Sequence, residues 1–417
     1  MIYSRRKYNP KYEVRKVQYE LNFLAFCTEA QIKSSKKIFD ILPPTKTMLD
    51  PSNPNADYLW NTYLGSALWA AYPKQYLEKV LGLTMKGRPE VQGFAEGQMQ
   101  KFFEYGYQGS NLLSLQAAIE EAIVKYGSCL LKICFPDDEE AFSAIPHIQV
   151  IPAKDVLDAN EDFYAYKEEK LLFDDEKKSY KNILLLHVLS LDADGLYYEA
   201  TLTEAQYQDF NFKNPSSSKV ESLVYPAWYG SLTSIPVIGL SYFDCNFSWA
   251  DAYSQPIQEL SWHLFRSEAD NRYALHQQST AHLMIAGADP KQNYPVGLGA
   301  VHVFNDADTK EEFIAPPTEG IKLQFEKLQW LHEQADGMLL NLVSASNASG
   351  EALRLQIGDK TNALVQMVQV VGTAIQRISE KVAIIVGANP DEIEYLPYLS
   401  FDVVDNEQVQ SITDIER

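Results

Sequence analysis

Two long helical patterns separated by a short run of small residues constrain the fold of this chain more than any other feature. Residues 319–343 and 351–387 place an apolar residue at about every third or fourth position. This spacing gathers apolar side chains on one face and is typical of amphipathic α-helices. Residues 344–350, which read SASNASG, carry no charge and lie between the two patterns. The sequence therefore predicts two long helices joined by a short, uncharged loop.

A third long helix and a small β-rich insertion precede this pair. Residues 253–282 form one helical stretch, and three short β candidates follow it at 283–287, 299–304 and 311–316. The apolar stripes of the three helices run through Ile257, Leu260, Leu264, Ala269 and Tyr273, then Ile321, Phe325, Leu328, Leu331, Ala335, Met338 and Leu342, then Leu353, Ile357, Leu364, Met367, Val371, Ala374, Ile378 and Ile385. Gly358 and Gly372 are positions at which the last helix can bend.

Residues 1–249 predict a mixed α and β domain. Helical patterns cover 58–82, with a break near Pro73, and 111–127, with Gly127 as the C-terminal stop. The run SCLLKICF predicts a strand, and further strands are expected at 147–153, 183–191, 196–202 and 234–240. We therefore predict an α+β fold.

Charge and cysteine content exclude some classes of function. The 417-residue chain has a formal net charge of −20, which argues against tight non-specific binding of nucleic acid, because such binding uses Lys and Arg to displace counterions. It does not exclude a surface along which DNA slides. Among the four cysteines, Cys129 and Cys134 lie at odd separation on one predicted strand, so they point to opposite faces and are poor co-ligands of a metal. No apolar stretch is long enough to span a membrane.

The usual catalytic and metal-binding motifs are missing from the sequence. It contains no phosphate-binding GxxxxGK[ST] loop, no HExxH motif and no GxSxG motif. The acidic groups at 137–140 and 306–312 do not match a calcium loop and are expected to be solvated turns. We therefore expect no catalytic residue, no metal and no cofactor. Two alternatives remain open at this point: a hydrolase that uses the N-terminal α+β domain, and a helical scaffold that oligomerises without a pore.

From residue 253 onward, the order of elements resembles that of the tailed-bacteriophage portal (head-to-tail connector) proteins. The segments LHQQSTAHLMIAGAD, VGLGAVHVFNDADTKEEFIAPPTEGI, LQWLHEQADGMLLNL and SGEALRLQIGDKTNALVQMVQVV are similar to one branch of that family. The upstream segments VKYGSCLLKICFP, HIQVIPAKDVLDA and SIPVIGL fall where wing-domain segments of that branch fall. The similarity covers most of residues 110–390 and is strongest from 275 to 375. It is a similarity of arrangement and short segments, without an invariant catalytic signature.

The resemblance implies a portal-like protomer. Its expected parts are an N-terminal arm and α+β wing at 1–249, a first stem helix at 250–282, a β-rich clip at 283–318, a second stem helix at 319–343, a tunnel loop at 344–350, a long wing helix at 351–388 and a short C-terminal or crown remnant at 389–417. Family members are structural proteins, so the resemblance implies no enzymatic activity.

The resemblance also implies partners and a location. Portal proteins form a ring, typically of twelve copies, at one capsid vertex, and double-stranded DNA passes through its channel during packaging and ejection. The ring docks terminase and later adaptor and tail proteins, and it contacts major capsid and scaffold proteins. The expected location is the virion, after assembly in the host cytoplasm and without a membrane.

Particular residues of this chain take roles by the same resemblance. The tunnel loop that faces DNA would consist of Ser344, Ala345, Ser346, Asn347, Ala348, Ser349 and Gly350, with Arg354 just after it. Arg266, Arg272, Lys322 and Lys327 are possible charges along the channel. Two simpler interpretations stay open: the loop is a plain helix–helix connection, and the four basic residues form inter-helix salt bridges with Glu326, Glu268 and Asp270.

Overall fold

The structure is a computed structural model of the whole chain. It describes residues 8–93, 97–134, 146–160, 163–174, 179–212, 214–218, 220, 222–226, 234–278, 282–286, 310–314, 319–339 and 350–399. The chain divides into two compact units. Unit 1 comprises residues 1–26, 73–258 and 339–417, and unit 2 comprises residues 27–72 and 259–338. Helices and sheets both contribute, which confirms the predicted α+β class.

Two antiparallel sheets form the centre of unit 1. The three-stranded sheet has the order β3-β2-β9, and the five-stranded sheet has the order β4-β5-β6-β7-β8. The strands are β2 (Ser128–Cys134), β3 (His147–Pro152), β4 (Val156–Asn160), β5 (Phe163–Asp174), β6 (Ser179–Leu191), β7 (Tyr197–Leu202), β8 (Ser222–Val224) and β9 (Val237–Ser241). The helices of this unit include α1 (Pro10–Ala25), α7 (Gln98–Tyr105), α8 (Leu112–Tyr126), α9 (Glu204–Asp209) and α12 (Gly350–Val386).

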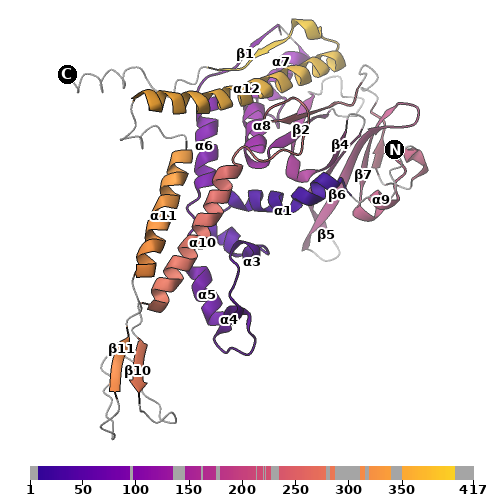
Figure 1. Cartoon of the computed structure of the whole chain (residues 1–417). Helices are drawn as coiled ribbons and strands as arrows, with labels where there is room; N and C mark the ends of the chain where they lie inside the picture. Colours follow the sequence, from indigo (N-terminus) through magenta and orange to yellow (C-terminus); the bar gives the residue numbers. More distant parts are fainter. Residues whose placement is uncertain are drawn as a thin grey trace, which may run out of the picture. The chain divides into compact units, whose positions relative to one another are not determined.

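Successive side chains of a strand point to opposite faces of the sheet, and the two faces pack into different hydrophobic clusters. In β2, Leu131 packs with α8 and α12, whereas Leu130 packs with residues of the five-stranded sheet. The far face of the five-stranded sheet packs against α1 and α9 through a cluster that includes Tyr12 and Tyr207. Unit 1 is therefore layered as helices, sheet, sheet and helices (Figure 1).

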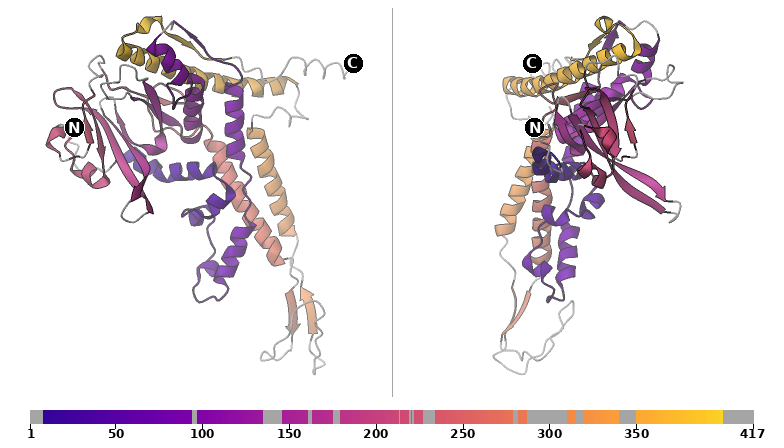
Figure 2. Two further views of the ribbon diagram at one scale, coloured as in Figure 1. Left: turned by 180° about the vertical axis from the view of Figure 1, so that it is seen from behind. Right: turned by 90° about the vertical axis from the view of Figure 1, so that its right-hand side faces the viewer.

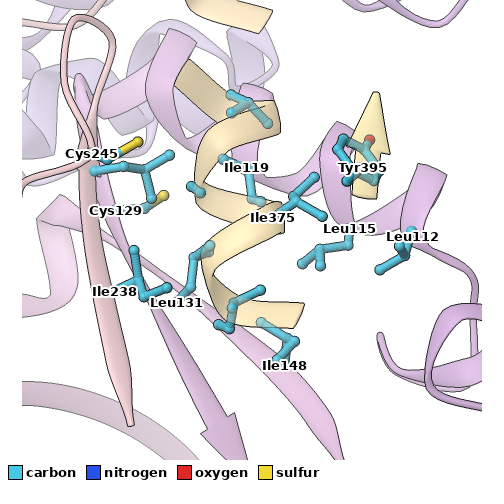
Figure 3. Packing of buried hydrophobic residues seen from close by; sticks show 14 of the residues in the cluster. Leu112, Leu115, Ile119, Cys129, Leu131, Ile148, Ile238, Cys245, Ile375 and Tyr395 are labelled. Atoms are coloured by element: carbon cyan, nitrogen blue, oxygen red, sulfur yellow. The ribbon is translucent and has the colours of Figure 1, made fainter. Parts of the chain in front are cut away.

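The largest cluster joins α12 to α8 and the three-stranded sheet. Figure 3 shows Ile375 of α12 among side chains of α8 and β2. Leu364, Met367, Val371, Ala374 and Ile378, which the predicted stripe includes, are all buried in the described part of α12. This confirms the stripe at these five positions, whereas the side chains of Leu353 and Ile357 lie outside the described part of the chain. Of the two strand cysteines, only Cys129 lies in this cluster, which confirms that Cys129 and Cys134 point apart.

The segment after α12 returns to unit 1 and packs closely against it. β12 (Glu394–Leu396) pairs antiparallel with β1 (Glu90–Gln92). Gly93 has a φ of 87°, and a Cβ there would lie 1.3 Å from the carbonyl oxygen of Glu392. A Cβ on Gly372 would lie 2.7 Å from Cγ of Pro397. The helix α12 continues through Gly372, so this glycine makes room for the returning chain.

Unit 2 combines short N-terminal helices with two long ones. It contains α2 (Glu29–Lys33), α3 (Ile38–Ile41), α4 (Lys46–Leu49), α5 (Ala56–Ser66), most of α10 (Gln255–Gln278) and α11 (Glu319–Met338), and α6 (Tyr72–Thr84) begins at its boundary. Between α10 and α11, β10 (His282–Ala286) pairs antiparallel with β11 (Lys310–Ile314). Residues 27–72, which the sequence places in the N-terminal domain, cluster with residues 259–338.

Several predicted boundaries move by a few residues or more. The helical pattern at 58–82 breaks between α5 and α6, at residues 67–71, and Pro73 lies in the first turn of α6, where its missing N–H costs little. The strand predicted at 299–304 lies outside the described residues. The strands β4, β5 and β8 were not predicted. Charged residues interrupt the apolar pattern of β4 and β5, and β8 is only three residues long.

Candidate functional site

Helix α10 presents opposite faces to two neighbours within unit 2. The Tyr63 hydroxyl of α5 donates a hydrogen bond to the Asp270 carboxylate at 2.8 Å. On α11, Nε2 of His332 lies 3.6 Å from Oε1 of Glu268. Positions 268 and 270 differ by about 200° around a helix. Helix α10 therefore lies between α5 and α11, as Figures 1 and 2 show.

Arg266 binds main-chain carbonyl groups on the α5 side of α10. Its Nε donates to the carbonyl oxygen of Ile41 at 2.6 Å, and its Nη2 donates to that of Asp40 at 3.3 Å. The last carbonyl groups of a helix have no partner within the helix. The guanidinium group therefore stabilises the C-terminal end of α3.

A chain of polar contacts links α10 and α11 on the other side. The Tyr72 hydroxyl oxygen lies 2.9 Å from Nδ1 of His332, and Glu268 contacts both His332 and Arg272. Burial, together with the Asp336 carboxylate, raises the pKa of Tyr72 to about 12, so its hydroxyl stays protonated. These contacts fix the two long helices against each other.

Much of the surface of α11 is exposed. Leu328, Leu331 and Ala335 are buried, which confirms three positions of the predicted stripe. Phe325 is 46% exposed, so the stripe was wrong at this position. It lies about 60° around the helix from Leu328, outside the narrow buried strip. The apolar side chains of Leu323 and Trp330 are also exposed.

The four predicted channel charges lie on α10 and α11. Arg272 forms an ion pair with Glu268 at 2.8 Å, and Lys322 lies 4.0 Å from Glu326. Both pairs follow the i,i+4 spacing within one helix, where such pairs contribute a few tenths of a kcal/mol. Glu268 and Glu326 therefore each form an ion pair with a basic residue of their own helix, not with a predicted channel residue of the other helix. Asp270 accepts a hydrogen bond from Tyr63 instead. Lys327 is exposed on α11.

The predicted tunnel loop lies almost entirely outside the described residues. Ser344, Ala345, Ser346, Asn347, Ala348 and Ser349 lie outside the described residues. Gly350 is the first residue of α12, and Arg354 belongs to the first turns of that helix. The acidic residues at 137–140, 306 and 308 also lie outside the described residues, whereas Glu311 and Glu312 lie in strand β11 and not in the predicted turn.

A buried ion pair in unit 1 was not anticipated from the sequence. Nζ of Lys132 donates to Oε2 of Glu199 at 2.6 Å, and the Tyr197 hydroxyl donates to Oε1 at 2.7 Å. Burial alone would lower the pKa of Lys132, but nearby Tyr166 and Glu199 raise it above its usual value. The one available signal was a lysine in the middle of the apolar run SCLLKICF.

The neighbouring side chains are paired with one another. Nε2 of His187 lies 2.8 Å from Oε2 of Glu168, and its ring stacks on Tyr166 at 4.6 Å. Burial lowers the pKa of His187, although Glu168 opposes this shift. Burial also raises the pKa of the nearby Cys134 thiol, so the reactive thiolate is disfavoured. This cluster therefore holds protonated or paired groups and offers no activated nucleophile.

A carboxyl group without a cationic partner lies in the main core of unit 1. Glu120 of α8 is fully buried. The Thr84 hydroxyl lies 2.5 Å from its Oε2, and Nε2 of Gln116 donates to its Oε1 at 2.7 Å. Burial raises the pKa of Glu120 to about 7, although both hydrogen bonds oppose this shift. The Tyr395 hydroxyl of β12 donates to Gln116 at 2.8 Å, so the network connects α8 to the returning segment.

Within the part of the chain that the structure covers, no group of three or more His, Cys, Asp or Glu side chains is placed to hold a metal ion. Among the described helices, none combines the length and the apolar character needed to cross a membrane.

The comparisons with known proteins give structural matches only. No family model and no curated protein matches this sequence. A chain in the virion of a native gene transfer agent (GTA) particle is similar with a TM-score of 0.39 and 10% identity, over 87% of this chain and 90% of that chain. A chain in the neck of a native GTA particle, computed with C12 symmetry, gives a TM-score of 0.38 and 11% identity, over 86% and 87%. Scores this low carry no argument about function.

Proposed function

We propose that this chain is the subunit of a bacteriophage portal ring, which forms the DNA channel at one capsid vertex. The observation that carries the proposal is the order of elements from α10 to α12. A long helix leads into an antiparallel β pair, a second long helix packs beside the first, and a third helix of 37 residues follows. This is the order of stem, clip, stem and wing helix that the sequence resemblance implies.

The energetics of α11 are consistent with assembly. A long helix that buries one narrow strip against its own chain leaves apolar side chains in water. Packing against further copies would remove that surface from water, and repeated contacts between unlike faces close into a ring when the rotation between copies allows it. We propose a ring of about twelve copies.

The proposed route of DNA follows from the same assignment. Residues 344–350 face the channel, and their small, uncharged side chains let the duplex pass without a tight grip on its phosphates. Arg354, Lys322, Lys327 and Arg272 supply scattered positive charge near this route. Arg266 is the weakest of the predicted channel residues, because its guanidinium group is engaged with α3.

The proposed partners are those of a conduit and assembly hub. Terminase docks during packaging, adaptor and tail proteins follow, and major capsid or scaffold proteins surround the ring in the virion after assembly in the host cytoplasm. We further propose that the chain is not an enzyme. The protonated Cys134 and the paired groups around His187 support this part of the proposal against a hydrolase.

Mass photometry followed by negative-stain imaging of the purified chain tests the proposal. The expected result is a species of about twelve times the subunit mass of 47.3 kDa, seen end-on as a ring with a central hole. A compact oligomer without a hole would instead favour the scaffold that lacks a pore. A chain that stays monomeric at every concentration, alone and together with its capsid protein, would contradict the portal assignment.

A further inference from the structure

We infer that the outer face of α11 binds the outer face of α5 in a neighbouring copy of this chain. This inference rests on the proposed ring and names the two surfaces through which its subunits meet. Three features of the described residues support it: exposed apolar side chains, a shared seven-residue spacing, and matched charge.

The outer face of α11 carries two large apolar side chains in line. Leu323 is 67% exposed and Trp330 is 54% exposed. They are seven residues apart, so they differ by only about 20° around the helix. The buried Leu328 lies on the opposite side of the helix, about 140° to 160° away from them, and the buried Leu331 lies about 80° to 100° away. A single exposed apolar residue is ordinary, but an aligned pair at this spacing is typical of a helix–helix contact.

The outer face of α5 has the same spacing and a complementary shape. Tyr58 is 62% exposed, and Gly65 lies seven residues after it on the same side of the helix. A Cβ added to Gly65 would meet no atom within 4 Å. Tyr63, which binds α10, lies on the opposite side. The outer face of α5 therefore carries one exposed aromatic ring, at Tyr58, and two turns later a position without a side chain, at Gly65.

These two faces point away from each other within one copy. Helix α10 lies between α5 and α11 and contacts them through Asp270 and Glu268, on opposite sides. Both outer helices run toward the same end of unit 2 in Figures 1 and 2. Rotation about an axis along the helices would therefore bring α11 of one copy against α5 of the next in a parallel arrangement.

One register pairs the apolar and the charged side chains of the two faces. Placing Leu323 on Tyr58 also places Trp330 on Gly65, where the missing side chain gives the indole ring room to approach. The same offset sets Glu326 beside Asn61 and places Lys327 on the same flank of the contact as Asp57, in the arrangement of flanking charge pairs between parallel helices. Lys327 and Asp57 are both exposed, so their side chains are able to reach each other across the contact.

Disulfide trapping tests the register directly. In the variant Leu323→Cys with Tyr58→Cys, mild oxidation should link each copy to the next, because a disulfide requires Cβ atoms within about 4.5 Å. The expected result is a ladder of covalent multimers on a non-reducing gel. Each single variant and the unmodified chain, treated in the same way, should give no ladder. These controls also report on the native cysteines, of which Cys129 and Cys245 are buried.

A substitution at Gly65 tests the same contact without oxidation. Gly65→Leu should raise the concentration needed for assembly by at least about tenfold, because the new side chain occupies the position of the Trp330 ring. The melting temperature of the dilute monomer should not fall, since the added atoms meet open space. Adding Trp330→Ala to Gly65→Leu should restore part of the assembly.

The outcomes separate this inference from the proposed function. Rings that form normally, fail to cross-link and tolerate Gly65→Leu would overturn the α11–α5 contact and leave the portal proposal standing. A chain that forms no ring under any condition would overturn both.

Discussion

The buried carboxyl group of Glu120 makes the stability of this protein depend on pH in a predictable way. Burial raises its pKa in the folded state to about 7, from 4.5 in an exposed side chain. The folded state therefore holds a proton that the unfolded state releases, so stability falls as pH rises from about 4.5 to about 7. A difference of about 2.5 pKa units corresponds to about 3 kcal/mol. This stabilisation is fully present below pH 4.5 and lost above pH 7.

The variant Glu120→Gln should remove this dependence. An amide can accept from Gln116 and donate to the Thr84 hydroxyl oxygen, since that hydroxyl can donate in turn to the Leu81 carbonyl oxygen at 3.3 Å. The variant should thus match the natural chain at about pH 4.5 and exceed its free energy of unfolding by about 3 kcal/mol at about pH 8.

Urea unfolding followed by circular dichroism between these two pH values measures the effect. The matched control is Glu121→Gln, the next residue of α8, whose carboxylate is half-exposed and pairs with Lys125. The raised pKa of Glu120 is refuted if the free energies of unfolding of Glu120→Gln and the natural chain differ by the same amount, to within about 0.5 kcal/mol, at every pH in this range.

Three further substitutions test other parts of the account. Gly372→Leu should destabilise the fold by about 2 kcal/mol or more, because the new side chain collides with Pro397. Limited proteolysis should then cleave the segment after α12 faster, and an unchanged cleavage rate would contradict this packing. Lys132→Met should cost about 2 kcal/mol in thermal unfolding, because it leaves the partly buried Glu199 carboxylate without its cation, and a neutral result would contradict that pairing. Arg354→Ala should leave ring assembly unchanged and lower the amount of DNA packaged per particle, whereas normal packaging would exclude a role for this charge.

The sequence predicts the long elements well because their periodicity is strong. The stripe through Leu364, Met367 and Ile378 identified the face of α12 that packs on unit 1. The αL conformation of Gly127, with a φ of 84°, likewise follows from its place after a helical pattern. In both cases the local pattern and the tertiary packing favour the same conformation.

Other features depend on contacts between residues distant in sequence, which a single sequence does not reveal. Gly372 looked like a bend point, yet its role is to admit Pro397. Phe325 has helical spacing but lies beside the buried strip of α11. The exposed pair Leu323 and Trp330 can be recognised only once the buried face of α11 is known from the structure. The site loop at 344–349 remains a prediction from the sequence and its resemblance.

The central claim is that copies of this chain enclose a channel lined by residues 344–350. A single-particle cryo-electron microscopy reconstruction of the purified assembly measures this directly. We expect a closed ring in which α10 and α11 form the channel wall and residues 344–350 lie at its narrowest point. A closed assembly without a continuous channel, or one that places these residues on its outer surface, would contradict the proposed portal function.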